Sequence, residues 1–345
     1  MSSQWRVDSY HINVGNGDCS IHVLVYLPSN SAYKCVLLDG GSALMGVDPG
    51  TGASGQNPIR NMLAYLDTAY KWTNLRCQFD TIVLSHWDED HYGNLLKTIK
   101  EDASQHNPIP YLKYDANNAP TTFFYAPNWL SGHRLNGAYW SYIREKNGIA
   151  EINMDFVPRG QTKSFTWIRF AILRNPEMGL NNVLGAEFFN NTLCTRPLNQ
   201  IGNIEALVQA NAPQTPPPAT TAMPCLYCIG VYQTTLGPPP VEVILEDPTR
   251  TNRVSIVCIL YWADTGRISH YLAGDADQVT EANVLRWVVD GGKWGRMTSV
   301  KVSHHGSRSS TPITPSLLRV AGPRTVVLSL PSGMHVHPCK WGRQN

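Results

Sequence analysis

The segment His86-Trp-Asp-Glu-Asp-His91 carries four side chains that can bind a metal ion within six residues. They are His86, Asp88, Asp90 and His91. The segment follows an apolar run, residues 79–84, which is typical of a buried strand. A tight loop after a rigid strand can turn several neighbouring side chains toward one point. The spacing therefore predicts a metal site, and the competing interpretation is a polar loop that caps the next helix.

Asp or His follows three further apolar runs. Asp275 comes after residues 269–272, where a lone Asp is more often a helix cap. His304 and His305 come after residues 300–303 and precede a glycine. His337 follows a run at 325–330 and is the weakest of these signals.

These side chains together favour a site for two metal ions. Asp88, Asp90 and Asp275 supply three negative charges, which nearly neutralise two divalent cations. The mixed imidazole and carboxylate ligands suit zinc, manganese or iron. Such ions lower the pKa of a bound water and so provide hydroxide near neutral pH, which is the chemistry of a metal-dependent hydrolase.

The order of these motifs resembles the metallo-β-lactamase superfamily, and most closely the subgroup of the ComEC-type hydrolase domain and phosphorylcholine esterase. The matching segments span residues 10 to 338. They are Asn13-Val-Gly-Asn-Gly-Asp18, Leu37-Leu-Asp-Gly-Gly41, Ser85-His-Trp-Asp-Glu-Asp-His-Tyr-Gly93, Ala273-Gly-Asp-Ala276, Lys301-Val-Ser-His-His-Gly-Ser307 and His337-Pro338.

The resemblance implies an α/β fold, an αββα sandwich with two metal ions at the sheet edges, and a role for each motif residue. His86 and Asp88 would bind one ion. Asp90, His91 and one His of the 304–305 pair would bind the other, and Asp275 would bridge them. His305 is the preferred ligand and His304 the preferred substrate contact, although the two can be exchanged. Asp39 would support the ligand loop from behind.

Two departures from the superfamily pattern concern histidines. The commoner motif has His where this chain has Asp88, as in the subgroup. The separate third-motif His has no clear match, and His133 is a candidate whose alternative is a histidine on a surface loop. His337 is retained as a substrate contact or a supporting residue.

The expected function is a binuclear metal-dependent hydrolase with two divalent ions, zinc (Zn) by preference and manganese or iron as alternatives. Its hydroxide would attack a small phosphoester, phosphodiester or carboxylic ester substrate, with Asp90 handling the proton and His304 stabilising the developing charge. Two alternatives stay open. One is a di-iron enzyme that performs redox or oxygen chemistry on a small molecule, and the other is a non-catalytic binding module.

Strands and helices must position these residues. Strand-like runs occupy the first forty residues, residues 164–173 and the last third of the chain. Helical spacing appears at 58–70, 92–100, 137–146, 281–289 and 315–320. We expect one metallo-β-lactamase-like domain over residues 1–345. It would carry a Pro- and Asn-rich surface insertion at about residues 175–240.

Composition narrows the class of protein. The 345 residues are 42% hydrophobic and only 16% charged, with a net charge of +2. This charge argues against tight binding to long nucleic acid. No run of 18 apolar residues occurs, so no membrane partner is expected. The eight Cys, mostly within apolar runs, indicate buried thiols and a cytoplasmic protein.

Overall fold

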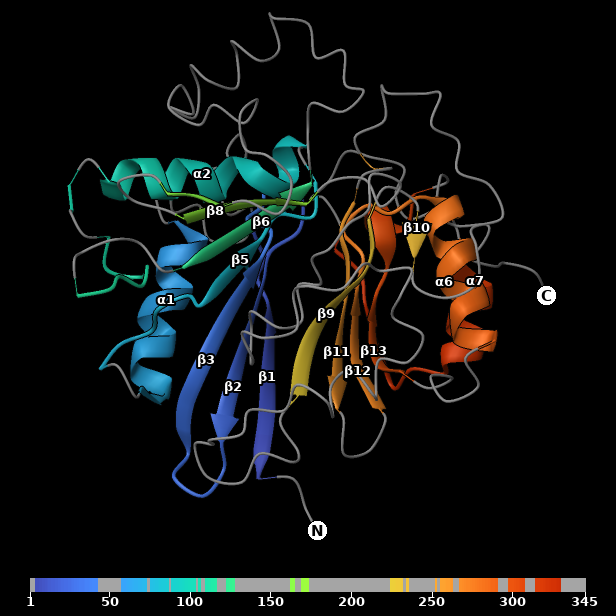
Figure 1. The fold of residues 1–345 in the computed structure, drawn as a ribbon, viewed down its shortest axis with the longest axis horizontal. Helices are drawn as coiled ribbons and strands as arrows, with labels where there is room; N and C mark the ends of the chain where they lie inside the picture. Colours follow the sequence, from blue (N-terminus) through green and yellow to red (C-terminus); the bar gives the residue numbers. More distant parts are fainter. Residues whose placement is uncertain are drawn as a thin grey trace, which may run out of the picture. The chain divides into compact units, whose positions relative to one another are not determined.

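The computed structural model divides into two compact units, Met1–Leu173 and Arg174–Asn345, and each is described by itself. It describes residues 4–42, 57–72, 75–86, 88–103, 105–106, 109–116, 122–127, 162–164, 169–173, 224–231, 234–235, 252, 255–262, 267–290, 297–307 and 314–329. Each unit contains a β-sheet and helices (Figure 1). The predicted α/β class is therefore confirmed.

The first unit contains an eight-stranded sheet in the order β1-β2-β3-β5-β6-β8-β7, with β4 beside β3. Its strands are β1 (Trp5–His11), β2 (Ser20–Tyr26), β3 (Ser31–Leu38), β4 (Lys71–Trp72), β5 (Thr81–Val83), β6 (Phe123–Pro127), β7 (Thr162–Ser164) and β8 (Arg169–Leu173). The strands β1, β2 and β3 pair antiparallel, whereas β3, β5, β6 and β8 pair parallel.

The described residues of this unit form two helices, α1 (Pro58–Ala69) and α2 (Glu89–Ala103). Helix α1 begins where the sequence predicts. The side chain of Asn57 accepts hydrogen bonds from the amides of Ile59 and Arg60, and Pro58 fits the first turn. Helix α2 begins at Glu89, three residues before the predicted start. The amide of His91 donates to the Asp88 carbonyl. Two carboxylates in the first turn stabilise the helix by their interaction with its dipole.

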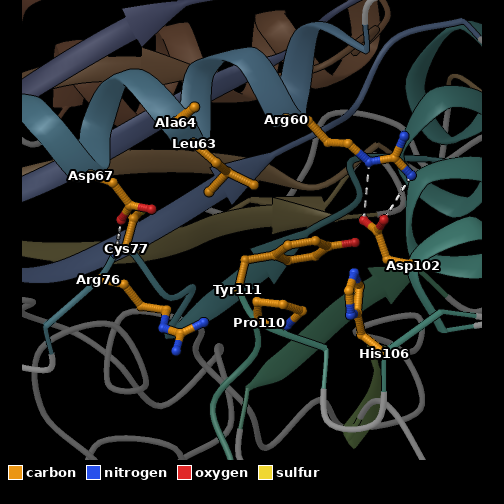
Figure 2. A pocket seen from close by; sticks show the side chains of 10 residues that line it. All are labelled: Arg60, Leu63, Ala64, Asp67, Arg76, Cys77, Asp102, His106, Pro110 and Tyr111. Carbon is orange, nitrogen blue, oxygen red and sulfur yellow. Dashed lines mark hydrogen bonds and ion pairs between the residues drawn. The ribbon is translucent and has the colours of Figure 1, made fainter.

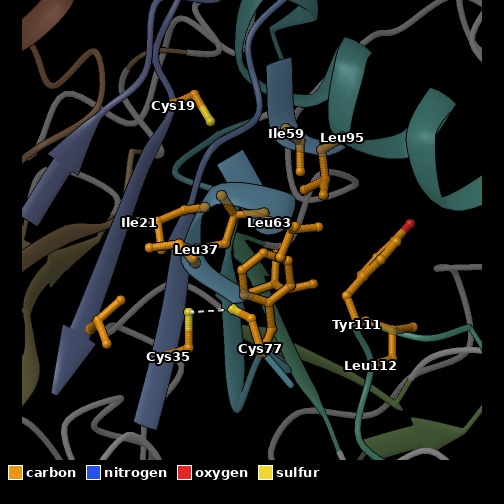
Figure 3. Close-up of a cluster of buried hydrophobic side chains, with 14 of the residues drawn as sticks. Cys19, Ile21, Cys35, Leu37, Ile59, Leu63, Cys77, Leu95, Tyr111 and Leu112 are labelled. Carbon is orange, nitrogen blue, oxygen red and sulfur yellow. Dashed lines mark hydrogen bonds between the residues drawn. The ribbon is translucent and has the colours of Figure 1, made fainter. Parts of the chain in front are cut away.

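The core of the first unit lies between the two helices and one face of the sheet (Figure 3). Alternate residues of β2 and β3, such as Ile21 and Leu37, pack against Leu63 of α1 and Leu95 of α2. All four side chains are buried. The two helices therefore rest on the face of the sheet that this alternation makes apolar.

The second unit contains a six-stranded sheet in the order β10-β9-β11-β12-β13-β14. Its strands are β9 (Pro224–Val231), β10 (Thr234–Thr235), β11 (Val257–Trp262), β12 (Arg267–Leu272), β13 (Met297–Lys301) and β14 (Thr325–Val327). The strands β10, β9, β11 and β12 pair antiparallel, and β12, β13 and β14 pair parallel. Parallel pairs need crossover connections, and helices supply them here.

Helix α6 (Gln278–Asp290) connects β12 to β13, and α7 (Thr314–Ala321) precedes β14. The two helices lie side by side (Figure 1). A short 3₁₀ segment, η6 (Ser303–Gly306), follows β13 directly. Because β12, β13 and β14 are parallel, their carboxyl ends lie at one edge of this sheet.

Two segments differ from the expected pattern. Residues 164–173 were predicted as one strand, but β7 and β8 pair antiparallel, because alternation along the chain does not reveal where the chain reverses. Part of the expected insertion, 175–240, belongs to the sheet, because β9 pairs with β11 over its length. Residues 175–223 and 236–240 lie outside the described residues, as does the helix predicted at 137–146, and the single domain stays a prediction.

No helix among the described residues is long and apolar enough to cross a membrane. Four cysteines that the structure describes, Cys19, Cys35, Cys77 and Cys258, are buried free thiols, as the sequence predicts.

Candidate metal centre

In the first unit, Asp39 connects the carboxyl ends of two neighbouring parallel strands. It follows β3, and its amide donates to the carbonyl of Val83 at the end of β5. Its Oδ1 accepts from the Ser85 amide at 2.7 Å, and its Oδ2 accepts from the Ser85 hydroxyl at 2.7 Å. Asp39 adopts a φ of 55°, a conformation that costs energy for any residue but glycine. These hydrogen bonds hold it there.

Asp39 also orients His91, which is fully buried in the first turn of α2. The Nδ1 atom of His91 lies 2.9 Å from Oδ2 of Asp39. Because a carboxylate only accepts, Nδ1 carries the proton and Nε2 keeps its lone pair. That Nε2 lies 3.9 Å from Oδ1 of Asp90.

His86 is oriented in the same way through Ser85. The Nδ1 atom of His86 lies 3.0 Å from the Ser85 hydroxyl oxygen. Since that hydroxyl gives its hydrogen to Asp39, it must accept from Nδ1 of His86. The Nε2 atom of His86 keeps its lone pair and lies 3.4 Å from Oδ2 of Asp88. We refer to His86, Asp88, Asp90, His91 and Asp18 as the first half-site.

Asp18 is a member that sequence reasoning missed, although the turn motif containing it was noted. It is 6% exposed, and its Oδ2 lies 4.0 Å from Nδ1 of His91. Its amide donates to the Asp90 carbonyl at 3.2 Å. Gly17 permits this approach, since a Cβ there would lie 1.6 Å from the Asp90 carbonyl oxygen. In the sequence, the only signal for Asp18 was the Gly17-Asp18 pair within a turn motif.

In the second unit, Asp275 follows β12 and is 3% exposed. The helix-cap interpretation applies instead to Asp277, whose Oδ1 accepts from the Thr280 amide at 3.1 Å. Asp275 points its two oxygens at two different histidines. Its Oδ1 lies 3.5 Å from Nε2 of His305, and its Oδ2 lies 3.7 Å from Nε2 of His304. We refer to Asp275, His304 and His305 as the second half-site.

The two adjacent histidines of η6 have different surroundings. The Nδ1 atom of His305 donates to the Ser329 carbonyl after β14 at 3.2 Å, so Nε2 keeps its lone pair beside Asp275. His304 is more exposed, and the Asn252 side-chain nitrogen lies 3.0 Å from its Nε2. Both residues have positive φ, 49° and 50°, which directs neighbouring side chains differently from a strand.

Two buried polar side chains support this loop. Glu281 of α6 accepts from the Ser303 hydroxyl at 2.8 Å and from the Thr314 hydroxyl at 2.5 Å. Burial raises the pKa of Glu281 from 4.5 to about 7. The ammonium group of Lys301 donates to the Gly274 carbonyl at 3.0 Å, beside Asp275. Glu281 of α6 therefore anchors the loop of His305, and Lys301 of β13 anchors the loop of Asp275.

The half-sites fit a metal ion by their hydrogen bonding. In His86, His91 and His305, Nδ1 donates to an oxygen while Nε2 presents a lone pair beside a carboxylate. Histidines that bind metals are oriented in this manner. Buried side chains in both units could hold a metal ion, namely Asp18, His91, Asp275 and His305. His133 and His337 lie outside the described residues.

No family model matches the chain, and no curated protein does so either.

Proposed function

We propose that the chain binds two divalent metal ions through residues of its two half-sites and that it is a metal-dependent hydrolase of small esters. The αββα sandwich of the metallo-β-lactamase superfamily is the arrangement proposed for the two sheets. The resemblance of the sequence motifs supports it, as does the position of both half-sites at the carboxyl ends of parallel strands, where α/β folds commonly bind ligands.

The orientation of three histidines is the observation that carries this proposal. His86, His91 and His305 each have Nδ1 held by a hydrogen bond, and their Nε2 atoms lie 3.4 to 3.9 Å from carboxylate oxygens. A histidine that only fills a core needs no such carboxylate beside its second nitrogen. The repeated arrangement is what metal ligation requires.

The charge of the half-sites supports two ions. Asp88, Asp90 and Asp275 carry −3, and Asp18 brings the total to −4, which equals the charge of two divalent cations in magnitude. Asp18 and Asp275 are almost fully buried. Burying a carboxylate costs desolvation free energy, and a divalent cation bound at each half-site would offset that cost.

The proposed roles follow from these positions. Bound divalent metals lower the pKa of a water ligand and provide hydroxide at neutral pH. Asp90 is half-buried and beside His91, where it would accept the proton of the attacking water. His304 is more exposed than His305 and carries a ring N–H, so it contacts the substrate oxygen that gains negative charge. The proposed substrates are small phosphoesters, phosphodiesters or carboxylic esters, and zinc is the preferred ion.

Metal content and hydrolysis test the proposal. The full chain is purified without added metal, reconstituted with zinc and analysed by elemental analysis. We expect two ions per chain. We also expect turnover of a p-nitrophenyl phosphomonoester, phosphodiester or acetate. Asp275→Ala should lower both metal content and turnover, and Asp115→Asn, at an exposed residue, is the matched control.

Each rival function has its own outcome. Fewer than one ion per chain after reconstitution contradicts the proposal. Iron with a visible absorption band and no hydrolysis favours the di-iron enzyme, and bound metal with no turnover of any substrate favours the binding module.

A further inference from the structure

The first unit contains a cavity of about 260 Å³ whose lining residues include none of the first half-site (Figure 2). It lies between α1, the end of α2 and the segments that flank β5. Its lining residues are Arg60, Leu63, Ala64, Asp67, Arg76, Cys77, Asp102, His106, Pro110 and Tyr111. Along α2, Asp102 is eleven residues from His91, which corresponds to roughly 16 Å. The cavity is thus a separate site.

Tyr111 lies at the centre of this cavity, with its hydroxyl directed toward the end that holds Asp102 and His106 (Figure 2). The residue is 7% exposed, and its hydroxyl oxygen has no hydrogen-bond partner among the described residues. Buried polar groups are almost always hydrogen-bonded, and Asp102, toward which this hydroxyl is directed, already pairs with Arg60, so the hydroxyl can donate to a bound ligand. Burial and the charge of Asp102 raise the pKa of Tyr111, which keeps it a neutral donor.

The carboxylates of the cavity already accept hydrogen bonds. Both oxygens of Asp102 pair with Arg60, at 2.8 Å and 3.3 Å. Asp67 accepts from the Cys77 amide at 2.5 Å. The groups that remain available to a ligand are hydrogen-bond donors. Arg76 and His106 are exposed at the rim, and within the described part of the chain no carboxylate pairs with Arg76.

Apolar surface lies between the polar ends. Leu63, Ala64 and Pro110 lie beside the ring of Tyr111, and Arg76 lies toward the end away from its hydroxyl (Figure 2). The volume is slightly below that of sites for drug-sized ligands, roughly 300 Å³ and above. A ligand that fits must therefore be small, with a short apolar body and an oxygen at each end.

We propose that this cavity binds a small organic oxyanion, with its carboxylate or phosphate at Arg76 and a neutral oxygen acceptor at the Tyr111 hydroxyl. The site is independent of the proposed metal centre, and nothing in the metal chemistry requires it. A carboxylic acid and a phosphorylated compound would both present an oxyanion to this site. The probes below decide between the two classes.

Calorimetric titration of the full chain, depleted of metal with a chelator, tests the proposal. The probes are 4-hydroxybenzoate and 4-hydroxyphenyl phosphate. Two control compounds are benzoate, which lacks the 4-hydroxyl group, and 4-hydroxybenzamide, which lacks the negative charge. We expect one of the two oxyanion probes to bind at least about tenfold more tightly than the amide, the factor that a charged hydrogen bond supplies. Whichever oxyanion binds better identifies the source.

Two variants connect the binding to named groups. Tyr111→Phe removes only the hydroxyl. It should therefore lower the affinity for 4-hydroxybenzoate by about tenfold and leave the affinity for benzoate unchanged. Arg76→Gln should weaken the binding of 4-hydroxybenzoate and leave the binding of 4-hydroxybenzamide unchanged. Tyr65→Phe and Arg319→Gln are matched controls at exposed positions outside the cavity.

Thermal unfolding separates binding from folding. Because the Tyr111 hydroxyl makes no hydrogen bond within the described part of the chain, Tyr111→Phe should unfold at the same temperature or higher. A lower unfolding temperature would assign the hydroxyl a structural role and overturn the proposal. Equal binding by both variants and the parent chain would overturn it as well, as would the absence of saturable binding by either oxyanion.

Discussion

The Nδ1 atom of His91 lies 2.9 Å from Oδ2 of Asp39, so the end of β3 determines the ring orientation of a residue in α2. The same Asp39 accepts from the Ser85 hydroxyl, which in turn accepts from His86. One carboxylate therefore sets the proton positions of both histidines in the first half-site. The orientation of the two proposed ligands therefore depends on Asp39, which is not itself one of them.

Asp39→Asn should reduce metal affinity without unfolding the chain. The amide keeps an oxygen for the Ser85 amide but offers a donor to Nδ1 of His91, which moves the histidine proton to Nε2. We expect zinc affinity to fall about 10- to 100-fold, as for other residues that orient metal ligands. Competitive titration with a chromophoric chelator measures it, and Asp8→Asn, at a surface ion pair, is the control. Unchanged affinity would show that Asp39 does not control the tautomer.

The two histidines of η6 should respond differently to removal. His305→Ala should lose metal, because its Nε2 lies beside Asp275 and its Nδ1 is held by Ser329. His304→Ala should keep metal and lose turnover. Elemental analysis and hydrolysis of a p-nitrophenyl phosphodiester, measured on both variants, decide the assignment. The reverse pattern would make His304 the ligand.

Glu281 should make stability depend on pH. Its pKa is raised from 4.5 to about 7 in the folded chain, so the folded state holds the proton more tightly than the unfolded state. The resulting stabilisation is fully present below pH 4.5 and is lost as pH rises through 7. The shift corresponds to about 3 kcal/mol.

Glu281→Gln stays neutral at every pH and should remove this dependence. Urea unfolding of metal-free protein at pH 5 and pH 8 should show the parent chain losing about 3 kcal/mol relative to the variant. Asp115→Asn, at an exposed carboxylate, should follow the parent. Parallel pH profiles for the parent and Glu281→Gln would mean that Glu281 does not titrate in this range.

Gly17→Ala should disturb the first half-site directly. A Cβ at this position would lie 1.6 Å from the Asp90 carbonyl oxygen, and the φ of 90° disfavours any side chain. We expect the free energy of unfolding to fall by at least about 2 kcal/mol and zinc affinity to fall with it. Gly322→Ala is the control, since its φ is 50° but no atom lies within 4 Å. It should cost only about 1 kcal/mol and leave zinc binding intact.

The sequence predicted the positions that depend on local patterns. Apolar runs placed Asp275 after β12 and the 304–305 pair after β13, and the spacing from Pro58 located α1. Asp18 was missed because its contact with His91 arises only when the turn after β1 packs on α2. The start of α2 was misplaced because Asp90 and His91, which the sequence marks as candidate metal ligands, lie with Glu89 in its first turn.

The supporting hydrogen bonds were less accessible still. Ser329 orients His305 through a backbone carbonyl, which any residue type would provide, so no sequence pattern marks it. Glu281 supports Ser303 across 22 positions of the chain, and its spacing in α6 fits an ordinary helix. Residues of this kind are recognised only when the chain's long-range contacts are known.

The reactivity of the buried thiols can report when each unit opens. Cys35 and Cys77 lie 3.8 Å apart in the core of the first unit, and Cys258 is buried in β11 of the second. Burial raises the pKa of Cys35, so the thiolate that reacts with alkylating reagents is scarce until the core opens. Pulsed alkylation with peptide mapping would therefore time the opening of each unit separately, with no substitution in either.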